Sequence, residues 1–150
     1  MLAALTALVV FLAGVSVPVP VSMPPRVDHV EPMDITGVEE PTLEELLTAA
    51  EVRHGLPDGI LHAVAWVESS MNPAVVGALG EVGLMQLHPR YHDTSGGVSG
   101  QIETAAAYLS GLIDRFGCVD LGLAAYNQGP ARPRVGAYVR RVHLAWDKNR

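Results

Sequence analysis

A run of apolar residues between Leu56 and Val67 constrains the fold of this chain more than any other stretch. Pro57 suits the first turn of a helix, where its missing N–H costs nothing. The residues that follow are apolar on almost every side, which is typical of a mostly buried helix. Pro73 ends any continuation of that helix. The stretch 56–70 therefore predicts a buried helix whose last turn carries a carboxylate, Glu68.

A second helix is predicted just before it. Thr42 and Glu45 have the spacing of a capping box, which marks a helix N-terminus. The apolar face that follows continues to about His54, and Gly55 is expected to end the helix.

Three later segments also carry helical signals. Apolar residues recur at helical spacing between Ser99, the expected N-cap, and Gly117. A short helix capped by Asp120 is expected to end near 127, and a last helix is expected over about 134–146. The glycine-rich stretch before Pro89 is expected to hold one helical turn, at 84–87. We find no convincing strand alternation, so the predicted fold is mainly α: a compact helical domain with a substrate groove and little or no β-sheet.

The first 41 residues differ in kind from the rest. Residues 1–22 are almost wholly apolar, and we interpret them as a signal peptide or an uncleaved membrane anchor. A buried helix of the folded domain is the alternative, which the Pro-Val-Pro-Val sequence at 18–21 disfavours. Residues 23–41 are rich in proline and acidic side chains, as in an extended linker. The folded domain is therefore predicted over 42–150.

Charge and cysteine content limit the partners. The net charge of −6 argues against a nucleic-acid partner. The single cysteine, Cys118, excludes an internal disulfide. Basic residues gather near the C-terminus, from Arg132 to Arg150. They form either a solvated face or a contact with an anionic polymer or membrane surface.

Glu68 is poorly placed for a negative charge. The last turn of a helix faces the negative end of the helix dipole, and apolar neighbours withdraw solvent. Both effects favour the neutral form and are expected to raise the pKa of Glu68. A carboxylic acid that stays protonated near neutral pH suits a general acid. The alternative is an ordinary surface glutamate at a frayed helix end.

Three polar pairs interrupt the apolar helical segments: Glu68-Ser69, Met85-Gln86 and Tyr126-Asn127. The second and third lie beside glycines, which let a backbone approach a ligand closely. Polar tips from several helix ends can line a binding groove. Taken singly, each pair has an alternative role in capping or turn formation.

Three blocks around these pairs stand in the order found in a known family. Glu68-Ser69-Ser70-Met71-Asn72-Pro73 comes first, then Gly80-Glu81-Val82-Gly83-Leu84-Met85-Gln86-Leu87, then Ala124-Ala125-Tyr126-Asn127-Gln128-Gly129-Pro130. Together they resemble the signature blocks of the soluble lytic transglycosylase catalytic domain, which has a goose-type lysozyme-like fold. Tyr108-Leu109 and the stretch Tyr138-Val139-Arg140-Arg141-Val142 also match the family pattern. The resemblance covers roughly residues 43 to 146.

The resemblance implies cleavage of the β-1,4 bond between N-acetylmuramic acid and N-acetylglucosamine in peptidoglycan, with formation of 1,6-anhydromuramoyl ends. It implies that Glu68 is the single catalytic acid/base. It also implies substrate-binding roles for Ser69, Met85, Gln86, Tyr126 and Asn127. Neither a cofactor nor a metal is expected.

Two features depart from the family pattern. The stretch between Pro89 and Gln101 is short, so any lid there is reduced and the groove more open. Gln128 occupies a position that is often alanine in the family, which could alter a subsite.

Other functions stay open at this point. The first is a hydrolytic lysozyme-type muramidase, for which Glu81, Asp93, Asp114 and Asp120 are candidate second carboxylates. The second is an inactive peptidoglycan-binding component of an envelope-spanning apparatus. The third is a metal enzyme using His88 and His92, which are four residues apart; Pro89 disfavours the helix such a pair needs.

The expected setting follows from the same resemblance. The expected partner is the glycan strand of peptidoglycan, with membrane association through residues 2–21. Export to the periplasm or cell envelope is expected, with a phage particle as the alternative location. A secretion, conjugation or phage apparatus is a further candidate partner.

Overall fold

The computed structural model describes residues 39–148, and within them it contains five helices and no strand. The helices are α1 (Leu43–Arg53), α2 (Ile60–Ser69), α3 (Gly97–Phe116), α4 (Val119–Gln128) and α5 (Ala137–Lys148). Two isolated β-bridges join Val82 to Val76 and to Leu87. The prediction of a mainly helical fold is confirmed.

The N-terminus of α1 lies where the sequence predicts it, with Thr42 as the N-cap. The Thr42 side chain accepts a hydrogen bond from the Glu45 N–H, and the Glu45 carboxylate accepts one from the Thr42 N–H. This is the predicted capping box, which satisfies otherwise unpaired N–H groups of the first turn. Gly55 adopts a left-handed conformation just beyond the helix end, at φ +62°. That conformation favours glycine, so the predicted stop is explained.

The start of α2 differs from the prediction. The helix begins at Ile60 rather than at Pro57, because Gly59 is left-handed at φ +78°. The carboxylate of Glu51, on α1, accepts hydrogen bonds from the Gly59 N–H at 2.8 Å and the Leu61 N–H at 2.6 Å. Glu51 is almost fully buried. It therefore caps α2 from the preceding helix, a contact that local sequence patterns do not reveal.

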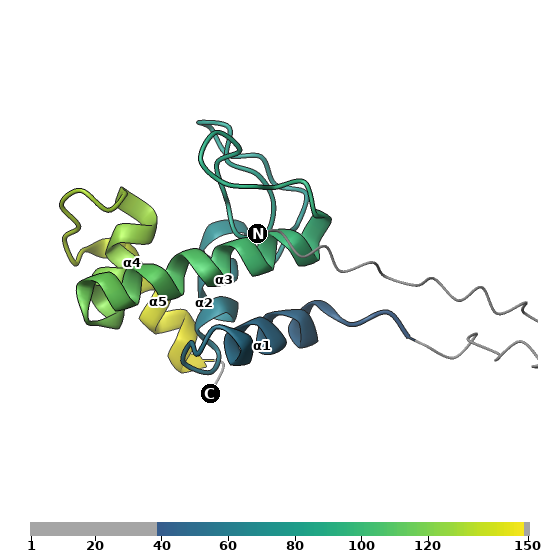
Figure 1. The fold of residues 1–150 in the computed structure, drawn as a ribbon, viewed down its shortest axis with the longest axis horizontal. Coiled ribbons are helices and arrows are strands. Elements are labelled where there is room, and N and C mark those ends of the chain that lie inside the picture. The colour runs from purple at the N-terminus through teal and green to yellow at the C-terminus, as the bar shows by residue number, and fades with distance from the viewer. Residues whose placement is uncertain (1–38, 149–150) are drawn as a thin grey trace, which may run out of the picture. The chain divides into compact units, whose positions relative to one another are not determined.

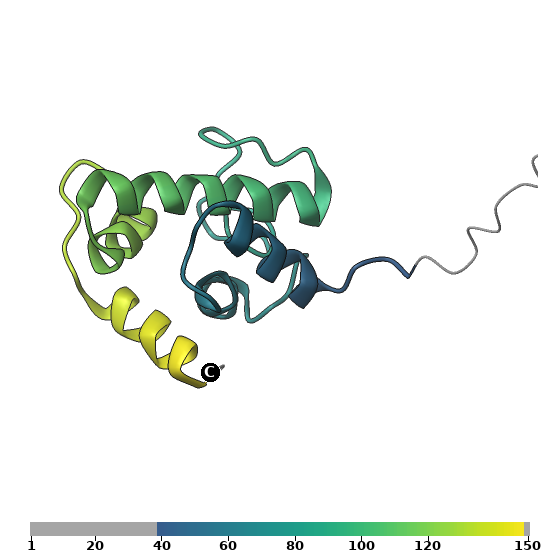
Figure 2. The same cartoon turned by 60° about the horizontal axis from the view of Figure 1, so that its bottom comes forward.

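Helix α2 lies between α1 and α5 (Figure 2) and packs against both. Its buried residues are Ile60, Leu61, Ala63, Val64, Ala65 and Ser69. They join a core drawn from all five helices and from the connection after α2. The sequence predicts a mostly buried helix, but the side chain of Trp66 on this helix is exposed. It lies on the side of α2 that faces away from the core.

Helices α3 and α4 pack closely against each other at one side of the domain (Figure 1). A Cβ on Gly122 would lie 2.5 Å from Cγ1 of Ile113, so the pair needs glycine at this contact. The N-cap of α3 is Gly96, three residues before the predicted Ser99, and Gly117 holds the C-cap position, where the sequence predicted the end of the helix. Cys118, not Asp120, holds the N-cap position of α4.

The connection between α2 and α3 is a folded loop rather than a helix. The Gly83 N–H donates to the Val75 carbonyl at 2.8 Å, and the Val82 N–H donates to the Leu87 carbonyl at 2.9 Å. Gln86 has a positive φ of 46°. This conformation is incompatible with a right-handed helical turn, so the predicted turn at 84–87 is wrong. The tight loop replaces it.

The last helix starts at Ala137, three residues later than expected at 134. The predicted segment 1–22 and most of the predicted linker 23–41 lie outside the described residues. No helix within residues 39–148 has both the length and the apolar character needed to span a membrane.

Candidate active site

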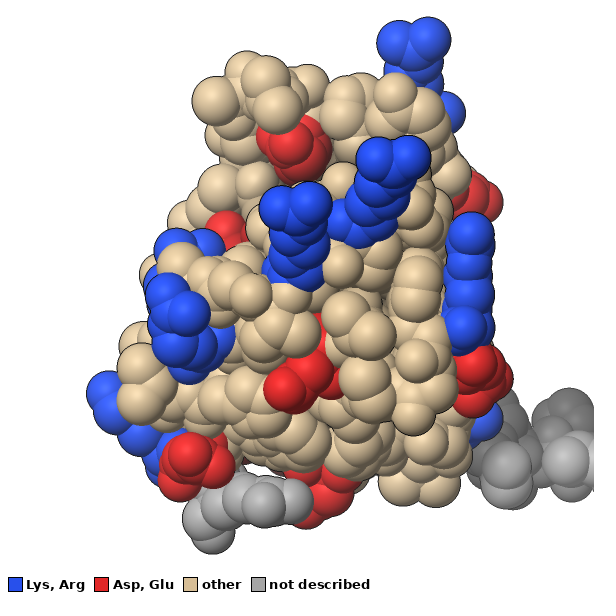
Figure 3. Space-filling view, turned by 90° about the vertical axis from the view of Figure 1, so that its left-hand side faces the viewer, with Lys and Arg blue, Asp and Glu red and all other residues tan. Residues whose placement is uncertain are grey.

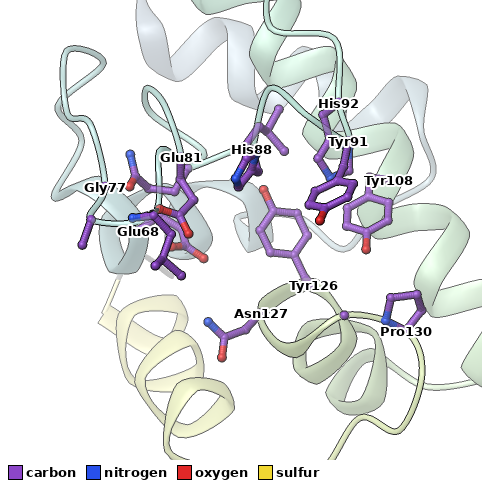
Figure 4. A pocket seen from close by; sticks show the side chains of 15 residues that line it. Glu68, Gly77, Glu81, His88, Tyr91, His92, Tyr108, Tyr126, Asn127 and Pro130 are labelled. Carbon is purple, nitrogen blue, oxygen red and sulfur yellow. Dashed lines mark hydrogen bonds between the residues drawn. The ribbon is translucent and has the colours of Figure 1, made fainter.

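A cavity of about 810 Å³ opens where the loop between α2 and α3 faces helices α3 and α4. Figure 4 shows the carboxylates of Glu68 and Glu81 in one part of it and the ring of Tyr126 near that of Tyr108 in another. Its walls are made by Glu68, Gly77, Ala78, Leu79, Glu81, Gln86, Leu87, His88, Tyr91, His92, Tyr108, Tyr126, Asn127, Gly129 and Pro130.

Glu68 enters this cavity from the last turn of α2. Its side chain is half-buried, and its Oε1 accepts a hydrogen bond from the Tyr138 hydroxyl at 2.7 Å. Burial raises the pKa of Glu68, and the nearby charge of Glu81 adds to the rise. The Tyr138 hydrogen bond and the Arg141 charge act in the opposite direction but do not cancel it. The direction agrees with the sequence prediction, and the main cause is burial.

The hydrogen bond to Glu68 joins helices that are far apart in the sequence. Tyr138 lies in the first turn of α5, and its side chain is buried. Burial raises the pKa of Tyr138 well above its usual value, so the phenol keeps its proton and acts as a donor. This bond fixes the orientation of one carboxylate oxygen of Glu68. The other oxygen has no hydrogen-bond partner within the described residues.

Tyr126 lies on α4 across the cavity from the loop. Its hydroxyl donates a hydrogen bond to the Met85 carbonyl at 2.8 Å. Burial, with the charge of Glu68, raises the pKa of Tyr126 well above its usual value. The phenol is therefore neutral, and it ties α4 to the loop that carries Gln86.

Aromatic rings continue from Tyr126 along the cavity wall. The ring of Tyr108 lies 5.6 Å from that of Tyr126, and the ring of His92 lies 4.6 Å from that of Tyr108. Tyr91 adds an exposed ring at the edge. Such rings present flat apolar faces with polar edges. This wall is therefore suited to a ligand with flat apolar surfaces and many hydroxyl groups.

The loop side of the cavity is held by its own hydrogen bonds. The Gln86 side-chain amide donates to the Gly83 carbonyl at 2.8 Å and to the Val75 carbonyl at 3.2 Å. Oε2 of Glu81 accepts the Leu79 N–H at 3.1 Å. A Cβ on Gly77 would collide with that Oε2 and lie 2.7 Å from Oε1 of Gln86. Glycine at 77 therefore lets these two side chains pack against the backbone.

Four of the six predicted site residues line this cavity: Glu68, Gln86, Tyr126 and Asn127. Met85 is fully buried and contributes its carbonyl to Tyr126. Ser69 is buried, and its hydroxyl donates to the Ala65 carbonyl within α2 at 3.0 Å. The side chains of Met85 and Ser69 do not line the cavity, and their roles in substrate binding stay predictions.

The structure adds residues that the sequence reasoning did not assign to the site. Tyr138 contacts Glu68, and Tyr91, His92 and Tyr108 form the aromatic wall. Tyr108 and Tyr138 stand in stretches that match the family pattern, so that signal was present in the sequence. The contribution of Tyr91 and His92 depends on the loop fold, which the sequence did not reveal.

The two histidines of the cavity, His88 and His92, each contact other residues: His88 accepts a hydrogen bond, and the ring of His92 lies against that of Tyr108. Nδ1 of His88 accepts the Arg90 N–H at 3.1 Å. Burial and the neighbouring His88 lower the pKa of His92. No group of three or more His, Cys, Asp or Glu side chains within residues 39–148 is placed to hold a metal ion.

Comparison with known proteins gives consistent matches. The transglycosylase SLT domain family matches residues 45–142. A protein described as a transglycosylase, from Enterobacteria phage PRD1, is 33% identical over 98 residues, covering 62% of this chain and 37% of the phage protein.

Two solved structures share the fold. An inactive mutant of the lytic transglycosylase Slt from Pseudomonas aeruginosa superposes with a TM-score of 0.55 at 23% identity, covering 67% of this chain and 22% of that one. The 70 kDa soluble lytic transglycosylase from Escherichia coli gives a TM-score of 0.51 at 25% identity, covering 70% and 20%. The chain thus matches about a third of the phage protein's length and about a fifth of each solved chain.

Proposed function

This chain belongs to the transglycosylase SLT domain family, and from that premise we propose that it is a peptidoglycan lytic transglycosylase. The bond cleaved is the β-1,4 linkage between N-acetylmuramic acid and N-acetylglucosamine. The product carries a 1,6-anhydromuramoyl end. The site of action is the bacterial cell wall, in keeping with the phage and bacterial relatives.

The observation that carries this proposal is the setting of Glu68. It combines a half-buried carboxyl group, a raised pKa and a position on the wall of a cavity with an aromatic side. A general acid must hold a proton at the working pH and must reach the leaving oxygen. Burial favours the first requirement by raising the pKa of Glu68, and the position on the cavity wall supports the second.

The reaction begins with proton transfer from Glu68 to the glycosidic oxygen. The bond from the muramoyl anomeric carbon to that oxygen breaks, and N-acetylglucosamine leaves with a free 4-hydroxyl. The carbonyl oxygen of the muramoyl N-acetyl group bonds to the anomeric carbon as the positive charge develops. The ionised Glu68 remains held by Tyr138.

In the second step the ionised Glu68 takes the proton of the sugar's own 6-hydroxyl. The 6-oxygen then bonds to the anomeric carbon, and the bond to the N-acetyl oxygen opens. Glu68 recovers its proton, and no water is consumed. One carboxyl group thus serves as acid and then as base, which explains why a second carboxylate is not required.

Tyr126 and Asn127 are the residues we assign to stabilisation of the charged species. Both lie on α4 and line the cavity opposite the loop. The Tyr126 hydroxyl is already oriented by its bond to the Met85 carbonyl, and an oriented neutral dipole stabilises developing charge without reorganisation. The aromatic wall and Gln86 would hold the sugar rings in register with Glu68.

A hydrolytic muramidase is the second candidate, because one observation favours it. Glu81 lines the same cavity and acts electrostatically on Glu68. Most glycoside hydrolases use two carboxyl groups, one of which activates water or attacks the sugar. The two reactions give products that differ by one water, so product analysis distinguishes them.

The primary test is a Glu68→Gln variant assayed for loss of turbidity of purified peptidoglycan sacculi. Glutamine can still accept the Tyr138 hydrogen bond but cannot donate a proton as an acid. We expect activity to fall by about a thousandfold, within the range known for general acid–base groups. Glu44→Gln, an exposed position on α1, is the matched control and should retain full activity.

Retention of activity by the Glu68→Gln variant would refute the proposal. Circular dichroism should show native helix content in both variants, so that lost activity cannot be assigned to unfolding. If neither the wild-type protein nor Glu44→Gln releases soluble products while binding sacculi, the chain is a binding component instead.

A further inference from the structure

A second concave surface lies on the outer side of α2 and α5, and none of the residues that line it lines the cavity. We call it the α2–α5 groove; it has a volume of about 280 Å³ and is lined by Trp66, Val67, Arg141, Leu144, Ala145 and Lys148. Trp66 is 56% exposed and Leu144 is 64% exposed. Two large apolar side chains thus face solvent within one hollow, an arrangement that is common at binding surfaces.

The spacing of residues on α5 explains how the groove forms. Arg141, Leu144 and Lys148 recur at intervals of three and four, so they share one face of the helix. The neighbouring face is buried against α2 through Val142 and Trp146, among others. The unburied face therefore offers an apolar centre between two cations.

The groove is positively charged, because Arg141 and Lys148 line it and no Asp or Glu does. Between residues 129 and 148 there are five Lys and Arg residues and one acidic residue, Asp147. Figure 3 shows that Lys and Arg side chains on this side of the molecule are interspersed with Asp and Glu side chains, whereas the two charged residues that line the groove are both cations. An anionic ligand is therefore favoured.

The groove also begins next to the general acid. Val67 directly precedes Glu68 on α2. The Arg141 guanidinium lies 5.9 Å from the ring centre of Tyr138, whose hydroxyl is bonded to Glu68. A ligand attached to a sugar beside Glu68 could therefore extend into the groove.

The shape of the groove limits the choice of ligand. A lipid bilayer presents a broad, flat surface, so it would contact the edges of the groove and not the residues at its base. Separate side chains of an extended peptide can enter the hollow one at a time. The ligand class that fits is thus a short peptide with small apolar groups and free carboxylates.

Peptidoglycan carries such a peptide on the lactyl group of each muramic acid. Its alanine residues supply methyl groups, and its D-glutamate and terminal residues supply carboxylates. The geometry points to the α2–α5 groove as a binding site for this stem peptide. The inference rests on the proposed function, because it requires the muramoyl sugar in the cavity.

The contacts can be assigned by chemistry. Methyl groups of the peptide would pack on Trp66 and Leu144, and its carboxylates would pair with Arg141 and Lys148. An extended chain of four or five residues spans about 14–18 Å. A tethered peptide gains from its high effective concentration, so even a weak groove contributes to binding.

The test compares two substrates: glycan strands that carry stem peptides, and the same strands after an amidase has removed the peptides. The variants are Trp66→Ala and Lys148→Gln; Arg141 is left intact because it also acts on Glu68. For each variant we expect kcat/KM to fall about fivefold to tenfold on peptide-bearing strands. On peptide-free strands it should stay within about twofold of the wild-type value.

Two matched control variants test whether the effect is specific to residues that line the groove. Val52→Ala removes an exposed apolar side chain on α1, and Arg134→Gln removes a charge from the loop between α4 and α5. Neither residue lines the groove. Both variants should show the wild-type ratio between the two substrates.

A binding measurement supplies a readout that does not need turnover. In the Glu68→Gln variant, a soluble stem pentapeptide of sequence L-Ala-D-Glu-L-Lys-D-Ala-D-Ala should change the tryptophan fluorescence at millimolar concentration. The chain has two tryptophans, and Trp66 is the exposed one. Trp66→Ala in the same background should lose the change.

The inference is overturned if the groove variants lose activity equally on both substrates, or if they lose none. It is also overturned if they cosediment less than wild type with vesicles of phosphatidylglycerol while keeping the wild-type substrate ratio. Cleavage of peptide-free strands by the wild-type protein reports on the proposed function separately. Suppose the wild-type protein cleaves those strands, and the groove variants keep the wild-type ratio of kcat/KM on peptide-bearing strands to kcat/KM on peptide-free strands. The proposed function then stands, and the stem-peptide site is refuted.

Discussion

Glu68 is subject to opposing influences whose sum sets its protonation. Burial and the Glu81 charge favour the protonated form, whereas the Tyr138 hydroxyl and the Arg141 charge favour the ionised form. The acid step needs the protonated form, so activity should fall as pH rises through the pKa of Glu68. Each neighbour therefore shifts the alkaline limb of the pH–activity profile in a direction that can be stated in advance.

Glu81→Gln and Arg141→Gln should shift that limb in opposite directions. Glutamine at 81 removes a charge that raises the pKa of Glu68, so the limb moves to lower pH. Glutamine at 141 removes a charge that lowers this pKa, so the limb moves to higher pH. The measurement is kcat/KM against pH on peptide-free glycan strands, which keeps the groove role of Arg141 out of the result.

The same pair of variants tests whether Glu81 takes part in the chemistry. As a charge alone, Glu81 affects the pH profile, and Glu81→Gln should keep at least about a tenth of the maximal rate. A loss of about a thousandfold at every pH would instead identify Glu81 as a second catalytic carboxyl group.

At the scale of a single element, the N-terminus of α2 depends on Glu51 of α1. Its carboxylate accepts two backbone N–H groups that no other group satisfies, and it is buried while doing so. Glu51→Ala should lower the free energy of unfolding by about 2–4 kcal/mol, because one buried and one partly buried N–H lose their acceptor. Urea denaturation followed by circular dichroism measures this change.

Glu44→Ala is the matched comparison for that experiment. Glu44 lies on the same helix and is exposed. Its loss should change the free energy of unfolding by no more than about 0.5 kcal/mol. Equal effects of the two substitutions would show that Glu51 does not cap α2.

The loop between α2 and α3 offers a second element-scale prediction. Alanine at Gly77 would displace the ends of the Glu81 and Gln86 side chains, both of which line the cavity. Because side-chain ends can move without unfolding the loop, activity should fall about tenfold or more while thermal stability changes little. Gly111→Ala on α3, where a Cβ meets no neighbour, serves as the control in melting and turnover assays.

Sequence patterns predicted the elements best where the signals were local. The capping box of α1 and the glycine stops after α1 and α3 are confirmed. The start of α2 was placed too early because its cap comes from Glu51, a residue of the preceding helix. The helical turn predicted at 84–87 does not form, because Gln86 has a positive φ. Its side chain is held there by hydrogen bonds to the Val75 and Gly83 carbonyls, which the local sequence does not reveal.

At the scale of the whole molecule, the sequence predicted the fold class and the family. It predicted only some of the residues that come together in the site. Glu68, Gln86, Tyr126 and Asn127 were selected from three separate blocks, and they line one cavity. The bond from Tyr138 to Glu68 spans 70 positions in the sequence, and no local pattern encodes it. The aromatic wall likewise depends on how the loop folds against α3.

The central claim is that Glu68 alone carries out both proton transfers and that the sugar's own 6-hydroxyl is the nucleophile. The most direct test is mass spectrometry of the soluble fragments that the wild-type protein releases from purified glycan strands. The account predicts fragments with 1,6-anhydromuramoyl ends, each one water lighter than the corresponding reducing-end fragment. Release of reducing-end fragments would contradict it and would assign the chain to the hydrolytic muramidases.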